Sequence, residues 1–493
     1  MQIGFDNEKY VRIQAERIRD RVSNFGGKLY LEFGGKLFDD YHATRVLPGF
    51  EADAKLRVLT QLAEDAEILL VTNANDIEGG KRRSDIGITY DDDVLRLMDA
   101  YHERGFLAKS IVITHYTGQS HADAFQKKLE SMGVTVYHHY LIDGYPSDMS
   151  YVVSDEGFGK NDFVKTSRPI VAVTAPGPGS GKLATCLSQL YHEHLHGVNA
   201  GYAKFETFPV WNLPLAHPVN IAYEAATADL NDRNVIDPFH LDNYGQITVN
   251  YNRDVETFPV LKAMLDQILG ESPYRSPTDM GVNMVGFCIN DDEVCCAAAK
   301  HEIVRRYFNT AEQVRRTGMG RDALANLELL MSKADITVDY DPAHRACLDR
   351  EENSGLPAGA MTLPNKQVMT GKRGDLLDPA ASLLLNSLKN LAGVPDETYV
   401  VSDEALAPIR TLKKDYLHSS NTLLSAGEML IALSSSSPSN PLAARTIAAA
   451  DDLKGLTAYF SVIISAADEA TYRQLGINVC CEPKFEHHVY YHN

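Results

Sequence analysis

Apolar side chains recur with two different periods along the first 180 residues of the chain. Helical spacing predicts helices near residues 7–24, 51–64, 92–104 and 120–132. Short runs rich in aliphatic and β-branched residues predict strands at 29–33, 67–72, 110–115, 134–142 and 170–174. Because strands and helices take turns, the pattern predicts an α/β fold whose largely parallel sheet has helices on both faces.

The pattern changes after about residue 240. Helical spacing dominates 255–269, 292–308, 310–316 and 321–334, and a further helix is predicted at 380–391. Strands are predicted at 399–401, 429–433, 458–465 and 477–481. The chain therefore divides into an α/β domain at 1–240, a mainly helical region at 241–339 and an α+β domain at 340–493. The aromatic and proline-rich segment 203–218 is interpreted as a loop, either facing a substrate or packed on the core as a lid.

A glycine-rich turn follows the predicted strand 170–174. It reads Ala175-Pro-Gly-Pro-Gly-Ser-Gly-Lys182, and helical spacing resumes directly after it. Backbone N–H groups at a helix start, together with a lysine, form a cradle for phosphate. We therefore expect a nucleotide or another phosphorylated ligand to bind at Gly177, Gly179, Ser180, Gly181 and Lys182.

The turn departs from a full P-loop at two positions. Pro176 stands where the first glycine belongs, and Leu183 replaces the hydroxyl residue that normally binds Mg²⁺. The turn also follows the fifth predicted strand, whereas a P-loop usually follows the first. A tight strand-to-helix turn that needs glycine only for its backbone angles is the alternative interpretation.

Polar residues follow the other predicted strands, and the carboxyl ends of parallel strands meet at one edge of a sheet. We expect one cleft lined by Glu32, Lys36, Asp76, Arg82, His115 and Lys182. Lys36 and Arg82 would assist phosphate binding, Asp76 or Asp143 would hold a Mg²⁺ ion that accompanies a nucleotide, and Lys182, Asp76 and His115 are the candidate catalytic residues. The reaction class is then that of a nucleotide-dependent transferase, ligase or hydrolase. The alternative is that these residues are polar because loops are solvated.

A second motif favours a different enzyme class. His192-Glu193-His194-Leu195-His196 matches H-E-x-x-H, in which the two outer histidines hold zinc and the glutamate is the base, with Glu224 as a possible third ligand. The same histidines also suit the last turn of a helix, where they interact with its dipole. Helical rise places them about 15 Å from Lys182, so one site cannot use both. A zinc hydrolase is therefore the weaker alternative.

Composition limits the partners. With 47 basic and 66 acidic residues the net charge is −19, which argues against nucleic acid and anionic membranes as partners. No apolar run reaches the length of a membrane helix, and the first residues lack the pattern of a secretory signal. Seven cysteines in 493 residues do not form a disulfide framework, so we expect a reducing, cytoplasmic location. A non-catalytic protein that self-associates through a sheet edge of residues 340–493 is a third hypothesis.

Several long strings in this chain closely resemble a bacterial family catalogued as a domain of unknown function. The matching strings are Asp76–Arg83, Ala175–Lys182, Gly201–Pro209, Tyr223–Asp229, Ser276–Asn283 and the tail segment beginning at Leu475. The resemblance covers essentially the whole chain. It implies an α/β amino-terminal region, a helical part and a distinct carboxyl-terminal domain, and it implies no activity, substrate or catalytic residue.

Overall fold

The computed structural model describes residues 2–34, 37–38, 40–83, 87–419 and 421–486. The chain divides into two compact units. The first contains residues 2–223 and 232–296, and the second contains residues 224–231 and the chain from 297 onward. Each unit has its own sheet, so each is described by itself.

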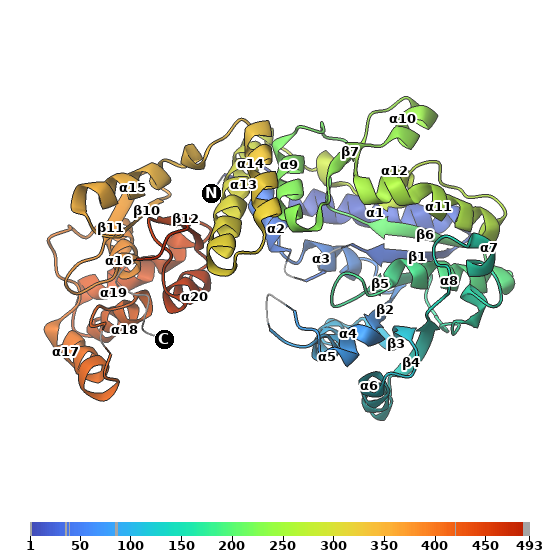
Figure 1. Cartoon of the computed structure of the whole chain (residues 1–493), viewed down its shortest axis with the longest axis horizontal. Helices are drawn as coiled ribbons and strands as arrows, with labels where there is room; N and C mark the ends of the chain where they lie inside the picture. The colour runs from blue at the N-terminus through green and yellow to red at the C-terminus, as the bar shows by residue number, and fades with distance from the viewer. Residues whose placement is uncertain (1, 35–36, 39, 84–86, 420, 487–493) are drawn as a thin grey trace. The chain divides into compact units, whose positions relative to one another are not determined.

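A seven-stranded sheet forms the centre of the first unit, and every strand pair in it is parallel. The strand order is β4-β3-β2-β5-β1-β6-β9, and the central strands follow one another in Figure 1. Nearly all side chains of β2 and all those of β5 are buried, so both faces of the sheet are covered. The strands are β1 (Lys28–Phe33), β2 (Ala66–Asn73), β3 (Leu107–Tyr116), β4 (Thr135–Tyr140), β5 (Ile170–Thr174), β6 (Ala200–Phe205) and β9 (Gly281–Val282).

Helices and a small two-stranded sheet complete this unit. The small sheet pairs β7 (Asn234–Ile236) with β8 (Val249–Tyr251). The helices before β5 are α1 (Asn7–Asn24), α2 (Tyr41–Val46), α3 (Ala54–Thr60), α4 (Ala74–Glu78), α5 (Tyr90–His102), α6 (Ser120–Ser131) and α7 (Met149–Val152). Those after it are α8 (Lys182–Leu195), α9 (Pro218–Ala226, whose last residues belong to the second unit), α10 (Pro238–Tyr244), α11 (Asn252–Leu269) and α12 (Pro277–Met280).

The strand order creates a switch point beside β5. Strand β1 lies next to β5, but the chain runs from β1 across β5 to β2, and from β5 across β1 to β6. Right-handed crossovers in opposite directions leave the sheet on opposite faces, which opens a crevice at the carboxyl ends of the two strands. The glycine-rich turn after β5 lies at this position. The fold therefore places the turn where open α/β sheets bind ligands.

The second unit is built on a smaller mixed sheet with the order β11-β10-β12-β13. Its strands are β10 (Ala358–Thr362), β11 (Val368–Lys372), β12 (Thr457–Phe460) and β13 (Asn478–Cys481). Leu383, Leu384 and Leu388 of α16 pack with Met361 and Phe460 in one apolar core. The helices are α13 (Asp292–Thr317, whose first residues belong to the first unit), α14 (Arg321–Lys333), α15 (Pro342–Ser354), α16 (Pro379–Leu391), α17 (Asp403–Thr411), α18 (Ala426–Ser436), α19 (Pro441–Ala448) and α20 (Ala466–Gln474).

The predicted fold class is confirmed: the structure has a parallel α/β sheet with covered faces and a separate mixed-sheet unit. Four local predictions were wrong. Residues 429–433 lie in α18, because Ser425 and Glu428 form a capping box that starts a helix there. Residues 399–401 form no strand, and the two helices predicted at 292–316 are the single helix α13. Residues 203–205, interpreted as loop, end β6, because sheet pairing outweighs the weak strand propensity of Gly201 and Lys204.

None of the helices in the described ranges combines the length and the apolar character that crossing a bilayer requires.

Candidate functional site

The glycine-rich turn is fastened to the carboxyl ends of two neighbouring strands. The side chain of Asn73, at the end of β2, donates a hydrogen bond of 3.2 Å to the carbonyl of Gly179. The hydroxyl of Thr114 on β3 donates one of 2.7 Å to the carbonyl of Ser180. Both contacts use carbonyl groups of the turn. They leave its N–H groups for other partners.

Three glycines of the turn are required by space or by backbone angle. A Cβ at Gly177 would lie 2.2 Å from the hydroxyl of Tyr90, and one at Gly181 would lie 3.1 Å from Thr114. Gly179 and Gly181 also have φ values of 75° and 89°, which side chains other than glycine rarely adopt. The glycine pattern therefore has a structural cause, and this cause is compatible with either interpretation of the turn.

The donors at the start of α8 have no partner among the described residues. Gly181 is the N-cap of this 14-residue helix, and no side chain caps it. The described part of the chain also supplies no hydrogen bond or ion pair to the ammonium group of Lys182, the first residue of the helix. The hydroxyl of Ser180 is buried and likewise lacks a partner there. A helix N-terminus with an adjacent lysine attracts anions.

The other residues predicted from strand ends have separate surroundings. Asp76 lies in the first turn of α4 and pairs with Lys81 at 3.2 Å. Arg82 donates to the carbonyl of Gly87, and the ring of His115 lies 3.3 Å from the hydroxyl of Thr114. Asp143 is exposed in the turn after β4. Lys36 lies outside the described residues.

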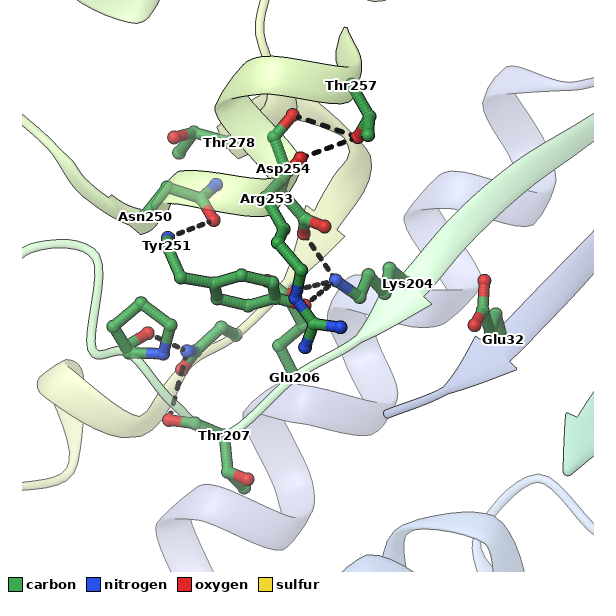
Figure 2. Close-up of polar contacts among 12 residues, drawn as sticks. Glu32, Lys204, Glu206, Thr207, Asn250, Tyr251, Arg253, Asp254, Thr257 and Thr278 are labelled. Atoms are coloured by element: carbon green, nitrogen blue, oxygen red, sulfur yellow. Dashed lines mark hydrogen bonds and ion pairs between the residues drawn. The ribbon is translucent and has the colours of Figure 1, made fainter. Parts of the chain in front are cut away.

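A cluster of buried charges lies at the end of strand β6, which β1 separates from β5 in the same sheet (Figure 2). Lys204 Nζ contacts the carboxylate of Asp254 and the hydroxyl of Tyr251, and it lies 3.0 Å from Glu206 Oε1. The Lys204–Glu206 contact is close enough for an ion pair, but its angles do not satisfy the geometry of a hydrogen bond. The side chains of Lys204 and Glu206 are only 16% and 11% exposed, so their charges are largely removed from water.

Burial and charge shift the titration of this cluster. Burial by itself lowers the pKa of Lys204, but Asp254, Tyr251 and the nearby carboxylates outweigh it and hold the pKa well above its ordinary value. Burial raises the pKa of Glu206 to about 7, against the lowering effect of Lys204. Asp254 and Glu32 raise it further. Lys204 therefore stays charged while Glu206 changes its charge near neutral pH.

Glu32 connects the β6 cluster with the turn. It stands beside Lys204 in the register of β1 and β6, and its carboxylate accepts a hydrogen bond of 2.7 Å from Tyr202. After burial, Glu32 is the largest influence that raises the pKa of the Cys186 thiol on α8, while Lys182 lowers it. Because both charges act on one thiol, Glu32 lies on the side of the sheet where α8 begins.

A small cavity adjoins Glu206. Its volume is about 10 Å³, close to the space of one water molecule, and its lining includes Asn250, Thr278, Gly281 and Asn283. A Cβ at Gly281 would lie 2.8 Å from Glu206 Oε2, so any side chain at this position would displace the carboxylate.

None of the site residues predicted from the sequence is Lys204, Glu206 or Asp254. Lys204 and Glu206 flank Phe205 at the end of a strand. Two charged residues at alternate positions of a strand end were the signal in the sequence that could have indicated a site. Interpreting residues 203–218 as a loop concealed it. Asp254 comes from α11, and its proximity depends on tertiary packing alone.

The H-E-x-x-H residues contact separate partners. The ring of His192 bonds to the carbonyl of Asn161 at 2.8 Å, and His196 bonds to the carbonyl of His192 at 2.6 Å. Glu193 pairs with Lys28 at 2.5 Å and accepts a hydrogen bond from Tyr30. Glu193 thereby joins α8 to β1. In the described residues, His192, Glu193 and His196 do not form a group of three potential ligand atoms that lie close together.

One group of three potential metal ligands occurs in the described ranges: His217, Asp292 and Cys296, whose ligand atoms lie within 4.8 Å of one another. His217 Nε2 faces both other residues. However, the N–H of Val219 donates to Nδ1 of the same ring at 3.2 Å. A neutral imidazole that accepts at Nδ1 carries its proton on Nε2, so Nε2 has no lone pair for a metal.

Comparison with known proteins identifies relatives across the whole chain. Residues 3–335 match "Domain of unknown function DUF1846, N-terminal", and residues 339–491 match its C-terminal counterpart. A UPF0371 protein of Streptococcus pneumoniae serotype 19F (strain G54) is 51% identical over 484 residues, which cover 98% of each chain. A UPF0371 protein of Streptococcus thermophilus (strain ATCC BAA-491 / LMD-9) is 50% identical over 488 residues, 99% of each chain. These matches confirm the resemblance found in the sequence.

Proposed function

The chain belongs to the DUF1846 family, whose description names no activity, and we therefore propose a function from the site itself: residues 177–182 bind the phosphate group of a small phosphorylated ligand, such as a nucleotide. The observation that carries this proposal is the set of unpartnered donors at the start of α8. There Lys182 and the N–H groups after Gly179 have no partner within the described residues. They lie where the strand order switches.

The cluster around Lys204 favours a catalytic role over simple binding. Phosphoryl transfer and nucleotide-dependent ligation both need a group that moves a proton, and Glu206 changes charge near neutral pH at the end of β6, which β1 separates from the strand of the turn. Mg²⁺ has no part in the proposal. Asp76 is paired with Lys81, Asp143 is exposed in another turn, and Leu183 offers no ligand atom.

Ligand titration tests the proposal. ATP, GTP, a sugar phosphate and inorganic phosphate are each titrated against the wild type, Lys182→Ala and the control Lys127→Ala, which removes an exposed lysine of α6. We expect at least one compound to bind the wild type and the control equally and to bind Lys182→Ala about tenfold or more weakly, since a charge-assisted contact contributes roughly 1.5–3 kcal/mol. Binding that Lys182→Ala leaves unchanged, or no binding at all, contradicts the proposal and favours a purely structural turn.

A further inference from the structure

We propose that Glu206 is the proton-transfer residue of this site, and that Lys204 and Asp254 are positioning residues that control its charge. The inference rests on the proposed function in one respect: it places an ionisable carboxyl at the same carboxyl edge of the sheet as the phosphate cradle, with β1 between them. Its own basis is the geometry of the β6 cluster, and its test has a readout that does not require a ligand.

The cluster at the end of β6 holds more carboxylates than cations. Three carboxylates, those of Glu32, Glu206 and Asp254, surround the single ammonium group of Lys204. Asp254 contacts Lys204 directly, and Glu32 has its own hydrogen bond from Tyr202. Glu206 has the weakest hold on the cation, because its 3.0 Å contact lacks hydrogen-bond geometry. Glu206 is therefore the group whose protonation relieves the excess negative charge at the smallest loss of hydrogen bonding.

Charged and ionisable groups from several elements act on Glu206. Lys204 on β6 stabilises its ionised form, whereas Glu32 on β1 and Asp254 on α11 stabilise its protonated form. The charge of Glu206 also raises the pKa of two phenols, that of Tyr251 at the end of β8 and that of Tyr223 on α9. Burial raises the pKa of both phenols, so both remain neutral at pH 7. The balance at Glu206 is therefore between one cation and two carboxylates.

The two charge states of Glu206 allow it to accept and to return a proton. Ionised Glu206 can accept the proton of a ligand hydroxyl or amine: the O–H or N–H bond breaks, its electron pair stays on the ligand atom, and the proton bonds to a carboxylate oxygen. Protonated Glu206 then returns that proton to a leaving oxygen or to water. The ligand class is a phosphorylated small molecule together with a hydroxyl- or amine-bearing acceptor.

The test is a ¹³C NMR pH titration of deuterated protein labelled at the glutamate side-chain carboxyl carbon. We expect one resonance that titrates between pH 6 and 8 and that disappears in Glu206→Gln but not in Glu130→Gln, an exposed control on α6. Asp254→Asn should lower its midpoint by about one pH unit and Lys204→Met should raise it, because they remove opposite charges. A merely structural role for these two residues would shift the midpoint in one direction.

ATP separates the two proposals. An anion bound at the end of β5, two strands from Glu206, should raise the midpoint of the Glu206 resonance, and near pH 7 this corresponds to uptake of up to about half a proton per ligand. If no glutamate titrates in this range, or if the titrating resonance survives in Glu206→Gln, the Glu206 proposal is overturned whatever ATP does. Binding of ATP that leaves the midpoint unchanged overturns it as well. Absence of ATP and phosphate binding contradicts the phosphate cradle only, and the titration then decides the role of Glu206.

Discussion

The hydroxyl of Thr114 donates a hydrogen bond of 2.7 Å to the carbonyl of Ser180, although 66 residues separate the two in sequence. This contact fastens the glycine-rich turn after β5 to the end of β3, which is not a neighbour of β5 in the sheet. It fixes the carbonyl side of the turn and so determines the direction in which the N–H groups point.

Thr114→Val removes this bond with little change in volume. We expect the free energy of unfolding to fall by about 1–2 kcal/mol, since the carbonyl of Ser180 loses its buried partner. Urea denaturation followed by the fluorescence of Trp211, the only tryptophan in the chain, measures the change. Thr135→Val replaces an exposed threonine of β4 and should be nearly neutral. Equal stabilities of the two variants would show that the bond does not hold the turn.

Gly181→Ala and Gly197→Ala distinguish crowding from backbone strain. Both glycines have positive φ, 89° and 74°, but only at Gly181 would a Cβ meet a neighbour, Thr114 at 3.1 Å. We expect Gly197→Ala to lower the unfolding free energy by about 1 kcal/mol and Gly181→Ala to lower it by about 1 kcal/mol more. Chemical denaturation of both proteins measures the difference. Identical losses would mean that the turn moves away from Thr114 freely.

Stability should fall at alkaline pH because of His344. Its two ring nitrogens lie 2.6 Å from Asp339 and 2.7 Å from Glu482, and although burial lowers its pKa, these two bonds raise it above the ordinary value overall. A raised folded-state pKa gives stability that is complete below about pH 6.5 and is lost as pH rises through the folded value. His344→Gln should abolish this part of the pH dependence, and melting temperatures between pH 5.5 and 9 measure it. The exposed His121→Gln should retain the wild-type profile.

Asp378 predicts a second pH effect in the same unit. Burial, and then the neighbouring Asp468, raise its pKa to about 8. The folded chain thus keeps a proton that the unfolded chain has lost above about pH 4, so stability falls as pH rises from about 4 to 8. Asp378→Asn retains an N-cap acceptor for α16 without the charge, and it should melt higher than the wild type at pH 8 and equally at pH 4.

Calorimetry measures the Asp378 effect, with Trp211 fluorescence as an internal reference for the first unit. Asp322→Asn, which removes an exposed carboxylate in the first turn of α14, controls for the loss of one charge. A profile of Asp378→Asn that runs parallel to the wild type would show that Asp378 is ionised throughout.

Glu193→Ala tests the role of the H-E-x-x-H segment. Removing one partner of the buried Lys28–Glu193 pair leaves an uncompensated ammonium group, so we expect a loss of roughly 3 kcal/mol in unfolding free energy. Metal analysis of the wild type and His192→Ala accompanies this measurement. Near-stoichiometric zinc that His192→Ala eliminates would restore the zinc hydrolase interpretation.

The hydrophobic pattern was enough to predict the class of the fold and most of its elements. The strand 170–174 and the helix 7–24 were predicted to the residue, because alternation between two hydrophobic periods is a local property of the chain. The glycine-rich turn was found for the same reason: its strand, glycines, lysine and helix are consecutive. Other local signals can outweigh the hydrophobic period. The capping box of Ser425 and Glu428 starts a helix in the segment where the hydrophobic pattern predicted a strand.

Tertiary structure decided which residues meet. Lys204 is the last residue but one of a strand that was predicted to be a loop in this part, and Asp254 lies in the first turn of a helix 50 residues later, yet the two are in contact. A hydrophobic pattern also does not specify the order of the strands. Strand β5 lies between β1 and β2 in the sheet, although it is far from both in the chain. The charge of Glu206 depends on burial and on Lys204, Asp254 and Glu32, which come from three different elements. Ionisation in a low-dielectric interior is a sum over neighbours in space, and sequence order does not specify those neighbours.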